Sequence, residues 1–465
     1  MKRDWLAQLN GAQRRAVEHG DGPLLIIAGA GSGKTRVLTY RIAYLLRERD
    51  VKPWQVLAVT FTNKAAAEMR ERIEGLIGPF GGGLWVGTFH ATCVQILRRH
   101  ADRLGYKSNF VILDRADQTA AMKRVLKTLN LDPRNFDPRA ILAAIGSAKN
   151  ELVDPVEYEK RSSDFRERHI ARCYRQYQSD LKANNAFDFD DLLVETVRLF
   201  DEHPDVLAEY QERFRYILVD EYQDTNRAQY VIVSRLAGGH RNLLVVGDAD
   251  QSIYAFRGAD IRNILEFEHD YPDAKVIKLE QNYRSTAHIL RAANELIENN
   301  RERPAKALWT ENPEGELIKL ARLPDERREA EYVADEIERL AGSEGLGLNQ
   351  VALLYRTHAQ SRTFEECFMR RATPYRIVSG LRFYERKEIK DAIAYLRLIA
   401  NPFDAISLER IINVPKRGIG EGTLAQLERY AAQTGLGLLD ACGDAAAIAP
   451  LGPAYTKRVL EFHRL

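Results

Sequence analysis

The segment from Ala28 to Thr35, which reads AGAGSGKT, constrains the fold more than any other part of the 465-residue chain. It follows the apolar run 24–28, which is typical of a strand buried on both faces of a sheet. It precedes a helical pattern over 36–49. A glycine-rich turn between a strand and a helix predicts a phosphate-binding loop, because glycines let backbone N–H groups turn inward and the helix N-terminus favours anions.

Within this loop, Lys34 is expected to reach the terminal phosphates of a nucleotide, and Thr35 is expected to place its hydroxyl on Mg²⁺. The usual pattern begins with glycine, where this sequence has Ala28. The predicted phosphate-binding residues are Ala28, Gly29, Ala30, Gly31, Ser32, Gly33, Lys34 and Thr35.

Apolar runs alternate with helical patterns along most of the chain, which predicts an α/β fold with parallel sheets. The expected strands of a first α/β domain are 24–28, 56–61, 84–89, 216–219, 242–246 and 275–279. A second α/β pattern follows residue 281, with expected strands at 316–322, 351–355 and 375–378. Three strands are few for such a sheet, so we expect the second domain to be incomplete.

The helical and charged stretches lie outside these strands and define the expected domains. The first α/β domain consists of residues 1–110 and 198–280, interrupted by an all-helical insertion at 111–197. The incomplete second α/β domain covers 281–382, and an incomplete helical accessory domain covers 383–465.

The composition is that of a globular protein, with 45% apolar and 29% charged residues and a net charge of +2. No apolar run approaches the roughly 20 residues of a spanning helix, and the first residues lack an apolar signal segment, so we expect a cytoplasmic protein without a membrane partner. The cysteines are far apart, which argues against a zinc ribbon and predicts buried free thiols. They are Cys93, Cys173, Cys367 and Cys442.

A second chemical motif ends the apolar run 216–219, which is followed by Asp220 and Glu221. In a parallel sheet, ligands bind beyond the carboxyl ends of the strands. We therefore expect Asp220 to hold Mg²⁺ and Glu221 to orient and deprotonate an attacking water.

A third motif follows the strand 242–246. Gln251 is a neutral polar group suited to sensing a γ-phosphate. Tyr254 and Phe256 precede Arg257, an arrangement that suits stacking on unpaired bases. Packing of the two rings in a core is an equally good interpretation of this segment alone.

These motifs occur in one order with four others, and together they resemble the superfamily I DNA helicases of the UvrD/PcrA/Rep type over nearly the whole chain. The motifs are 9–13 (LNGAQ), 28–35, 60–66 (TFTNKAA), 88–91 (TFHA), 220–225 (DEYQDT), 248–258 and 281–285 (QNYRS). The resemblance implies two RecA-like domains with helical insertions. It also implies an ATP- and Mg²⁺-dependent motor that moves 3′ to 5′ on single-stranded DNA and separates duplex.

The resemblance further implies roles for individual residues. Gln13 would read the adenine edge and Tyr283 would stack on the base. Arg36 and Arg284 would contact phosphates, with Arg284 acting as an arginine finger, and Gln251 would couple the γ-phosphate to the DNA site. The catalytic set is therefore Lys34, Asp220, Glu221, Gln251 and Arg284.

The same resemblance implies a path for the DNA strand. The residues that would contact it are Phe61, Thr62, Asn63, Thr88, His90, Phe189, Tyr254, Phe256, Arg257, Arg356, Lys416, Arg417, Gly418 and Gly420. The last four form a loop like the duplex-contacting loop of the family, with backbone N–H groups and basic side chains for phosphates. For Phe61, His90 and Phe189 a core role stays open, and for Arg257, Arg356 and the 416–420 loop a solvated surface role stays open.

Two residues depart from the family pattern. Phe256 stands where a tryptophan is usual, which reduces the stacking area, and His358 stands where an asparagine is usual. Counterparts of the last family motifs are missing, so we expect an N-terminal piece of a longer protein that binds ATP and single-stranded DNA but unwinds poorly.

Three other functions stay open at this point. The chain could be the helicase subunit of a recombination helicase–nuclease, an ATP-gated module that binds single-stranded DNA without unwinding it, or a small-molecule phosphotransferase. The expected partners are single-stranded DNA, single/double-strand junctions and repair or replication proteins, with a nucleoid-associated location in the cytoplasm.

Overall fold

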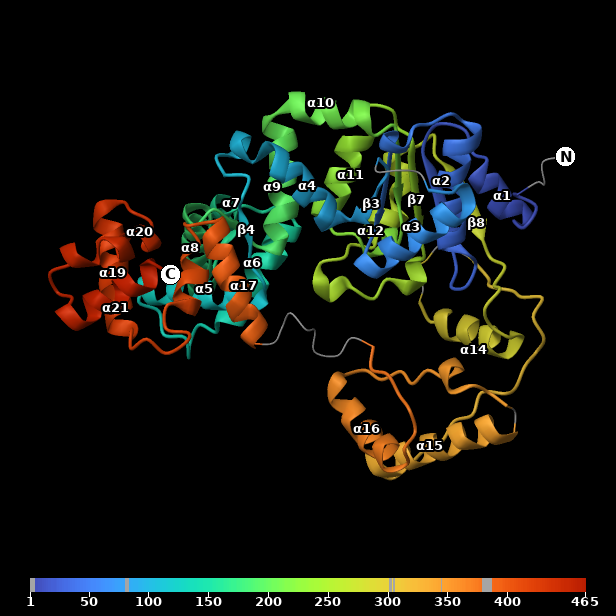
Figure 1. Ribbon diagram of the computed structural model, residues 1–465. Helices are drawn as coiled ribbons and strands as arrows, with labels where there is room; N and C mark the ends of the chain where they lie inside the picture. The colour runs from blue at the N-terminus through green and yellow to red at the C-terminus, as the bar shows by residue number, and fades with distance from the viewer. Residues whose placement is uncertain (1–4, 80–82, 301–302, 304–305, 344, 379–386) are drawn as a thin grey trace. The chain divides into compact units, whose positions relative to one another are not determined.

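The computed structural model describes the chain except for residues 1–4, 80–82, 301–302, 304–305, 344 and 379–386 (Figure 1). Its described residues form two compact units, residues 1–315 with 391–465 and residues 316–390. The larger unit is built on a six-stranded parallel sheet with strand order β3-β2-β6-β7-β1-β8. These strands are β1 (Leu24–Ala28), β2 (Val56–Thr60), β3 (Trp85–Thr88), β6 (Tyr216–Val219), β7 (Leu243–Gly247) and β8 (Lys275–Leu279).

The six strands agree with those predicted for the first α/β domain, and the predicted α/β class with a parallel sheet is confirmed. Alternate residues of each central strand enter two different cores, because side chains along a strand point to opposite faces. Leu25 and Ile27 belong to one core, and Leu24 and Ile26 belong to the other. The sheet is therefore buried on both faces, as its continuous apolar runs indicate.

Helices cover both faces of this sheet (Figure 1). One core contains residues of α1 (Gly11–Val17), α2 (Lys34–Glu48) and α3 (Asn63–Ile77). The other contains residues of α4 (Phe89–His100), α9 (Phe189–Glu202), α10 (Pro204–Arg213), α11 (Arg227–Ala237), α12 (Arg262–Leu265) and α13 (Phe267–Asp270). The short helix α14 (Ala287–Ile297) follows β8.

The insertion between β3 and β6 has a core of its own. Its helices are α5 (Arg115–Thr128), α6 (Pro138–Asn150), α7 (Pro155–Arg161) and α8 (Phe165–Ala183). It was predicted to be all-helical, but β4 (Val111–Ile112) pairs in parallel with β5 (Ala186–Phe187). The two short strands close the insertion where it leaves and rejoins the first domain. Its predicted end at residue 197 falls inside α9, because α9 packs on α4 and α11 of the sheet domain.

The part of the chain from residue 387 to 463 is helical, as predicted. It contains α17 (Lys387–Ala400), α18 (Ala405–Ile411), α19 (Glu421–Thr434), α20 (Leu438–Gly443) and α21 (Pro453–His463), which share one core. The predicted boundary at 382/383 lies outside the described residues.

The smaller unit differs from its prediction. Its described residues contain α15 (Glu326–Ser343) and α16 (Ser361–Arg370), packed around a core of five buried residues. The expected strands 316–322, 351–355 and 375–378 are not strands in the structure and belong to no sheet. Some of their apolar residues are largely exposed, Leu320 by 98% and Leu354 by 88%. An apolar run forms a stable strand only when a neighbouring strand pairs with its backbone groups. Residues 281–315, predicted to belong to this second domain, pack with the larger unit.

Candidate nucleotide and nucleic-acid site

The glycine-rich loop has the geometry that its sequence predicts. Gly31 and Gly33 adopt positive φ angles of 68° and 89°, a region that side chains disfavour. A Cβ on Gly31 would lie 2.6 Å from the Asn282 amide nitrogen, so neighbouring groups leave no room for one. Ser32 closes the turn by donating its hydroxyl to the Gly29 carbonyl at 2.7 Å. The loop leads directly into α2 at Lys34, so its residues fit a phosphate group at a helix N-terminus.

Gln13 is buried beside the loop. Its amide Nε2 donates to the Ser32 carbonyl at 2.9 Å, and its Oε1 accepts from the Asn10 backbone N–H at 3.1 Å. Asn10 also caps α1 and donates to the Tyr283 hydroxyl at 2.8 Å. Gln13 and Tyr283, both predicted to contact the adenine base, are thus connected through one asparagine.

Residues 281–285 lie directly against the loop. The Tyr283 N–H donates to the Gly31 carbonyl at 3.0 Å, and the Asn282 side chain donates to the Ala30 carbonyl at 2.6 Å. The Asn282 oxygen in turn accepts from the Arg284 backbone N–H at 2.8 Å. This arrangement brings the predicted arginine finger next to the phosphate loop, within the same compact unit.

The two acids after β6 stand at the carboxyl edge of the same sheet. Lys34 Nζ lies 3.2 Å from Glu221 Oε2. Burial, together with the charge of Glu221, raises the pKa of Asp220 to about 7. Glu221 has a left-handed φ of 51°, which turns the chain sharply away from the strand. A cation placed here would favour the ionised form of Asp220.

Asp220 and Thr35 supply the oxygen ligands that Mg²⁺ prefers, and a Mg²⁺ ion is usually held by one or two carboxylates with phosphates and water. Among the described residues, no cluster of three His, Cys, Asp or Glu side chains could hold a metal ion without further ligands. Asp220 and Thr35 fit a Mg²⁺ ion that binds together with nucleotide phosphates.

A hydrogen-bond network joins the acids after β6 to those after β7. Gln223 donates to Glu221 at 3.0 Å, and its oxygen accepts from the Asp248 N–H at 2.9 Å. The Asp248 carboxylate is shared by the Gln251 amide and by Lys306. The predicted phosphate sensor is thus tied both to the predicted catalytic acid and to a buried lysine.

Two functional candidates in this network were missed by sequence reasoning. Lys306 pairs with Asp250 at 2.9 Å as well as with Asp248, and Arg303 binds Asp250 through two hydrogen bonds of 2.7 and 2.8 Å. Burial opposes the charge of Asp250, but these cations hold its pKa below the usual value. Neither cation lies near a motif, so no local signal could have found them; Gln223, by contrast, is inside the 220–225 motif.

Three aromatic rings from two strand ends form a first stacking cluster. Phe61 stacks on Tyr254 with ring centroids 5.4 Å apart, and Tyr254 meets Phe256 at 6.1 Å. Arg257 lies over both of the latter rings, at 5.2 and 5.5 Å. Phe256 is 73% exposed, so the cluster presents an aromatic face to solvent rather than filling a core.

A second aromatic pair lies at the start of two helices. His90, in the first turn of α4, meets Phe189 edge-on at 5.9 Å, and Phe189 is the exposed first residue of α9. Burial lowers the pKa of His90, which favours its neutral form. Thr62 and Thr88 cap the neighbouring helices α3 and α4 through their hydroxyls, and Asn63 is the exposed first residue of α3.

The remaining predicted residues have mixed surroundings. Arg36 donates to the Gln8 side chain at 3.1 Å, and Arg356 is exposed in the smaller unit. Lys416 is exposed, whereas the Arg417 guanidinium turns inward to the Val414 carbonyl at 3.0 Å. The turn that follows contains Gly418 at φ 70° and Gly420. The inward contacts explain how the 416–420 loop is held, and a DNA role for Arg417 stays a prediction.

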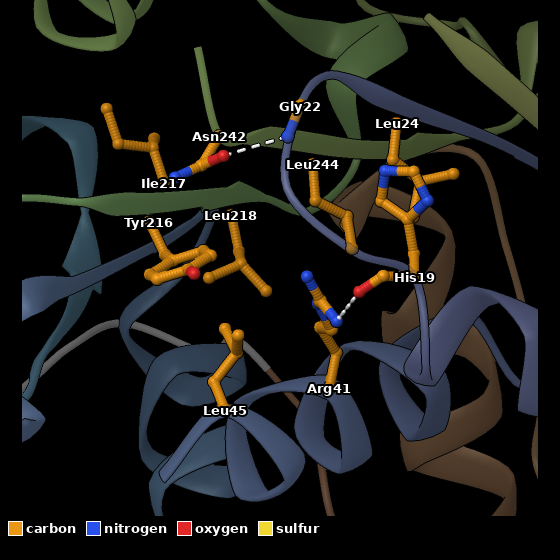
Figure 2. Close-up of a pocket in the computed structure, with 10 residues that line it drawn as sticks. All are labelled: His19, Gly22, Leu24, Arg41, Leu45, Tyr216, Ile217, Leu218, Asn242 and Leu244. Atoms are coloured by element: carbon orange, nitrogen blue, oxygen red, sulfur yellow. Dashed lines mark hydrogen bonds between the residues drawn. The ribbon is translucent and has the colours of Figure 1, made fainter. Parts of the chain in front are cut away.

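Figure 2 shows a small pocket at the opposite end of the sheet, near the first residues of β1 and β6. The Arg41 guanidinium lies there and donates to the carbonyls of Val17, His19 and Gly20. Burial lowers the pKa of Arg41 to about 10. Because parallel strands have all their carboxyl ends at one edge, this pocket is remote from the glycine-rich loop, and Arg41 holds the end of α1 there.

Two general expectations can also be checked against the described residues. All four cysteines are free and buried, as predicted. Along the described part of the chain, no helix has the length and apolar character needed to cross a membrane.

Comparison with known proteins gives two family matches. Residues 9–272 match the UvrD/REP helicase N-terminal domain, and residues 277–449 match the UvrD-like helicase C-terminal domain. The first match ends at residue 272 and the second begins at residue 277, so they meet at the start of β8.

Two similar curated proteins have the same name. The chain is 55% identical over 436 residues to the ATP-dependent DNA helicase PcrA of Bacillus subtilis. The aligned region covers 94% of the chain and 59% of that protein. It is 53% identical over 460 residues to the protein of the same name from Staphylococcus aureus strain Mu50, with 99% and 63% coverage. The chain thus spans about three fifths of the length of these relatives.

Proposed function

Because the chain belongs to the UvrD/REP helicase family, we propose that it couples ATP hydrolysis to movement on single-stranded DNA, as a 3′ to 5′ DNA translocase and helicase. The observation that carries the proposal is the shared edge of one parallel sheet. The glycine-rich loop, the acids Asp220 and Glu221, and the Phe61–Tyr254–Phe256 cluster all follow carboxyl ends of its strands. A phosphoanhydride site and a base-stacking surface are therefore built on the same strand ends.

The proposed ATP chemistry uses the residues of the loop edge. ATP with Mg²⁺ would supply the phosphoanhydride bond, held by Lys34, Thr35 and Asp220. Lys34 and Glu221 form an ion pair with each other in the structure. A negative charge in the loop would draw Lys34 away from Glu221 and leave that carboxylate to orient a water and accept its proton.

The proposed coupling runs through Gln251. Its amide is held by Asp248, which also accepts Lys306, and three residues later the chain reaches Tyr254 of the aromatic cluster. A change in what Gln251 binds would therefore alter the support of the stacking rings. Arg284, beside Gly31, would contribute positive charge to the same phosphates.

The first test is steady-state ATP hydrolysis with and without oligo-dT, compared for the wild-type chain and Glu221→Gln. Strong stimulation by DNA that the substitution abolishes would support the proposal. Hydrolysis that DNA does not stimulate, without DNA binding, would refute it in favour of a small-molecule phosphotransferase. Salt-dependent DNA binding without stimulation would support an ATP-gated binding module instead.

Unwinding, junction recognition, repair or replication partners, and a cytoplasmic, nucleoid-associated location are further parts of this proposal. A forked duplex with a 3′ single-stranded tail, compared with one that has a 5′ tail, tests both unwinding and its direction. Unwinding of the 5′-tailed fork alone would contradict the proposed polarity.

A further inference from the structure

The two groups of aromatic residues proposed to contact DNA come from separate parts of the chain. The end of α6 contacts residues that hold each of them in place. The Phe61–Tyr254–Phe256 cluster belongs to the sheet domain, whereas Phe189 begins α9 at the edge of the insertion. The last two residues of α6, Lys149 and Asn150, contact residues next to each cluster.

Lys149 holds the start of α9. It is 1% exposed, and its Nζ lies 2.8 Å from Asp188 Oδ2 and 2.7 Å from Asp191 Oδ1. These two aspartates cap α9 reciprocally, since each accepts the other's backbone N–H, at 2.8 and 3.0 Å. Phe189 lies between the capping residues, so its backbone is fixed relative to the end of α6.

Asn150 faces the opposite way, toward the sheet domain. Its side-chain oxygen accepts from Asn226 Nδ2 at 2.6 Å. Its side chain also packs on Gly258, where a Cβ would lie 2.9 to 3.2 Å from three of its atoms. Gly258 has a φ of 85° and directly follows Phe256 and Arg257. The close approach requires glycine and places Asn150 against the end of residues 254–257, the aromatic loop.

The partner Asn226 belongs to the segment that begins at the catalytic acids. It caps α11, and the preceding Thr225 carbonyl accepts from the Asp260 N–H at 2.9 Å and from Asn263 Nδ2 at 3.0 Å. Asn150 and the segment of Asn226 therefore both contact residues just after the aromatic loop, Gly258 in one case and Asp260 in the other. Asn150 therefore bonds the insertion to a segment that also holds the residues after Gly258.

From these contacts we infer that Asn150 is a positioning residue that sets the spacing between Phe189 and the Phe61–Tyr254–Phe256 cluster, so that one DNA strand engages both. Lys149 fixes the same helix end to Phe189, and Asn150 fixes it to Asn226 and Gly258. The inference rests on the proposed function, because it presumes that both clusters bind bases.

The test is fluorescence anisotropy with labelled oligo-dT of about 16 and about 4 nucleotides. Asn150→Ala removes the hydrogen bond to Asn226, and Asn150→Asp keeps an acceptor for it. One hydrogen bond corresponds to a loss of about 3- to 10-fold in affinity. We expect that loss for Asn150→Ala with the longer strand only, near-wild-type binding for Asn150→Asp, and an unchanged KM for ATP without DNA. Asn135→Ala, an exposed position of the same insertion, is the matched control.

The outcomes separate the inference from the proposed function. Wild-type chain that binds neither oligonucleotide overturns the proposed function and the inference together. Wild-type binding that Asn150→Ala leaves unchanged overturns the inference alone. Equal losses on both strand lengths, with a lower melting temperature, would also overturn it, because a general loss of structure does not depend on the length of the DNA.

Discussion

Replacing Lys149 by methionine is expected to destabilise the chain in a way that depends on pH. Lys149 is fully buried and touches the carboxylates of Asp188 and Asp191. Burial opposes its charge, but the two carboxylates raise its pKa overall, so it stays protonated. The methionine has a similar volume and leaves two buried acids without a cation. Breaking a buried ion pair from one side costs about 3–5 kcal/mol.

The pH dependence of this loss follows from the two carboxylates. In the wild-type chain, the Lys149 charge lowers the pKa of Asp188 against its burial, while burial and the Asp188 charge raise that of Asp191 to about 7. Without Lys149, the pKa values of Asp188 and Asp191 rise in the folded state, whereas in the unfolded chain both stay at about 3.9. The folded variant then binds more protons, so its stability falls as pH rises, by about 1.4 kcal/mol per pH unit for each extra proton.

Urea unfolding followed by circular dichroism at pH 5 and pH 8 measures both effects. We expect Lys149→Met to lose more stability at pH 8 than at pH 5. Adding Asp188→Asn and Asp191→Asn removes the stranded charges and keeps the capping oxygens, so most of the stability should return and the pH dependence caused by the two acids should disappear. Lys160→Met, at an exposed lysine of the insertion, should stay within about 0.5 kcal/mol of wild type. If Lys149→Met lost the same free energy of unfolding at pH 5 and at pH 8, the reasoning would be refuted.

Three further substitutions test the proposed site. Glu221→Gln should lower DNA-stimulated ATP turnover by about 10²–10⁴-fold with little change in nucleotide affinity, and turnover near the wild-type rate would exclude Glu221 as the base. Phe256→Ala should weaken oligo-dT binding by about 1–3 kcal/mol, with Phe256→Trp at least as tight as wild type; equal affinity for the alanine variant would contradict stacking. Lys306→Met leaves Asp248 without its cation beside Gln251, so stimulation by DNA should fall while basal ATP turnover persists; a parallel loss of both would show a general defect.

The sequence was sufficient to predict the sheet and the edge where the candidate site residues lie, because the relevant signals are local. A strand that is buried on both faces appears as an apolar run, and all parallel strands place their carboxyl ends together. Asp220 and the glycine-rich loop could therefore be assigned to one edge without coordinates. The prediction of strands at 316–322 and 351–355 was wrong, because a strand also needs a neighbouring strand. An apolar pattern cannot show whether such a neighbour is present to pair with it.

Contacts between distant segments could not be predicted in this way. Lys306 reaches Asp248 across 58 positions of the chain, and Asn150 reaches Asn226 across 76. A lone lysine or asparagine has no periodicity that distinguishes a buried partner from a solvated side chain. Glu221 is intermediate: its motif was evident, but its left-handed backbone and its pairing with Lys34 were not.

The close packing of strand ends explains how a small change at the nucleotide edge can reach the stacking rings. The Asp220 N–H donates to the Val59 carbonyl at 2.9 Å, and Phe61 is the second residue after Val59. Neighbouring strands lie only about 4.8 Å apart, so the predicted metal ligand and the first aromatic ring leave adjacent strands side by side. A shift of the Asp220–Glu221 turn must therefore either move the end of β2 with it or break the hydrogen bond from Asp220 to Val59. The proposed nucleotide-dependent motion would therefore reach Phe61 directly, in addition to the proposed route through Gln251 to Tyr254.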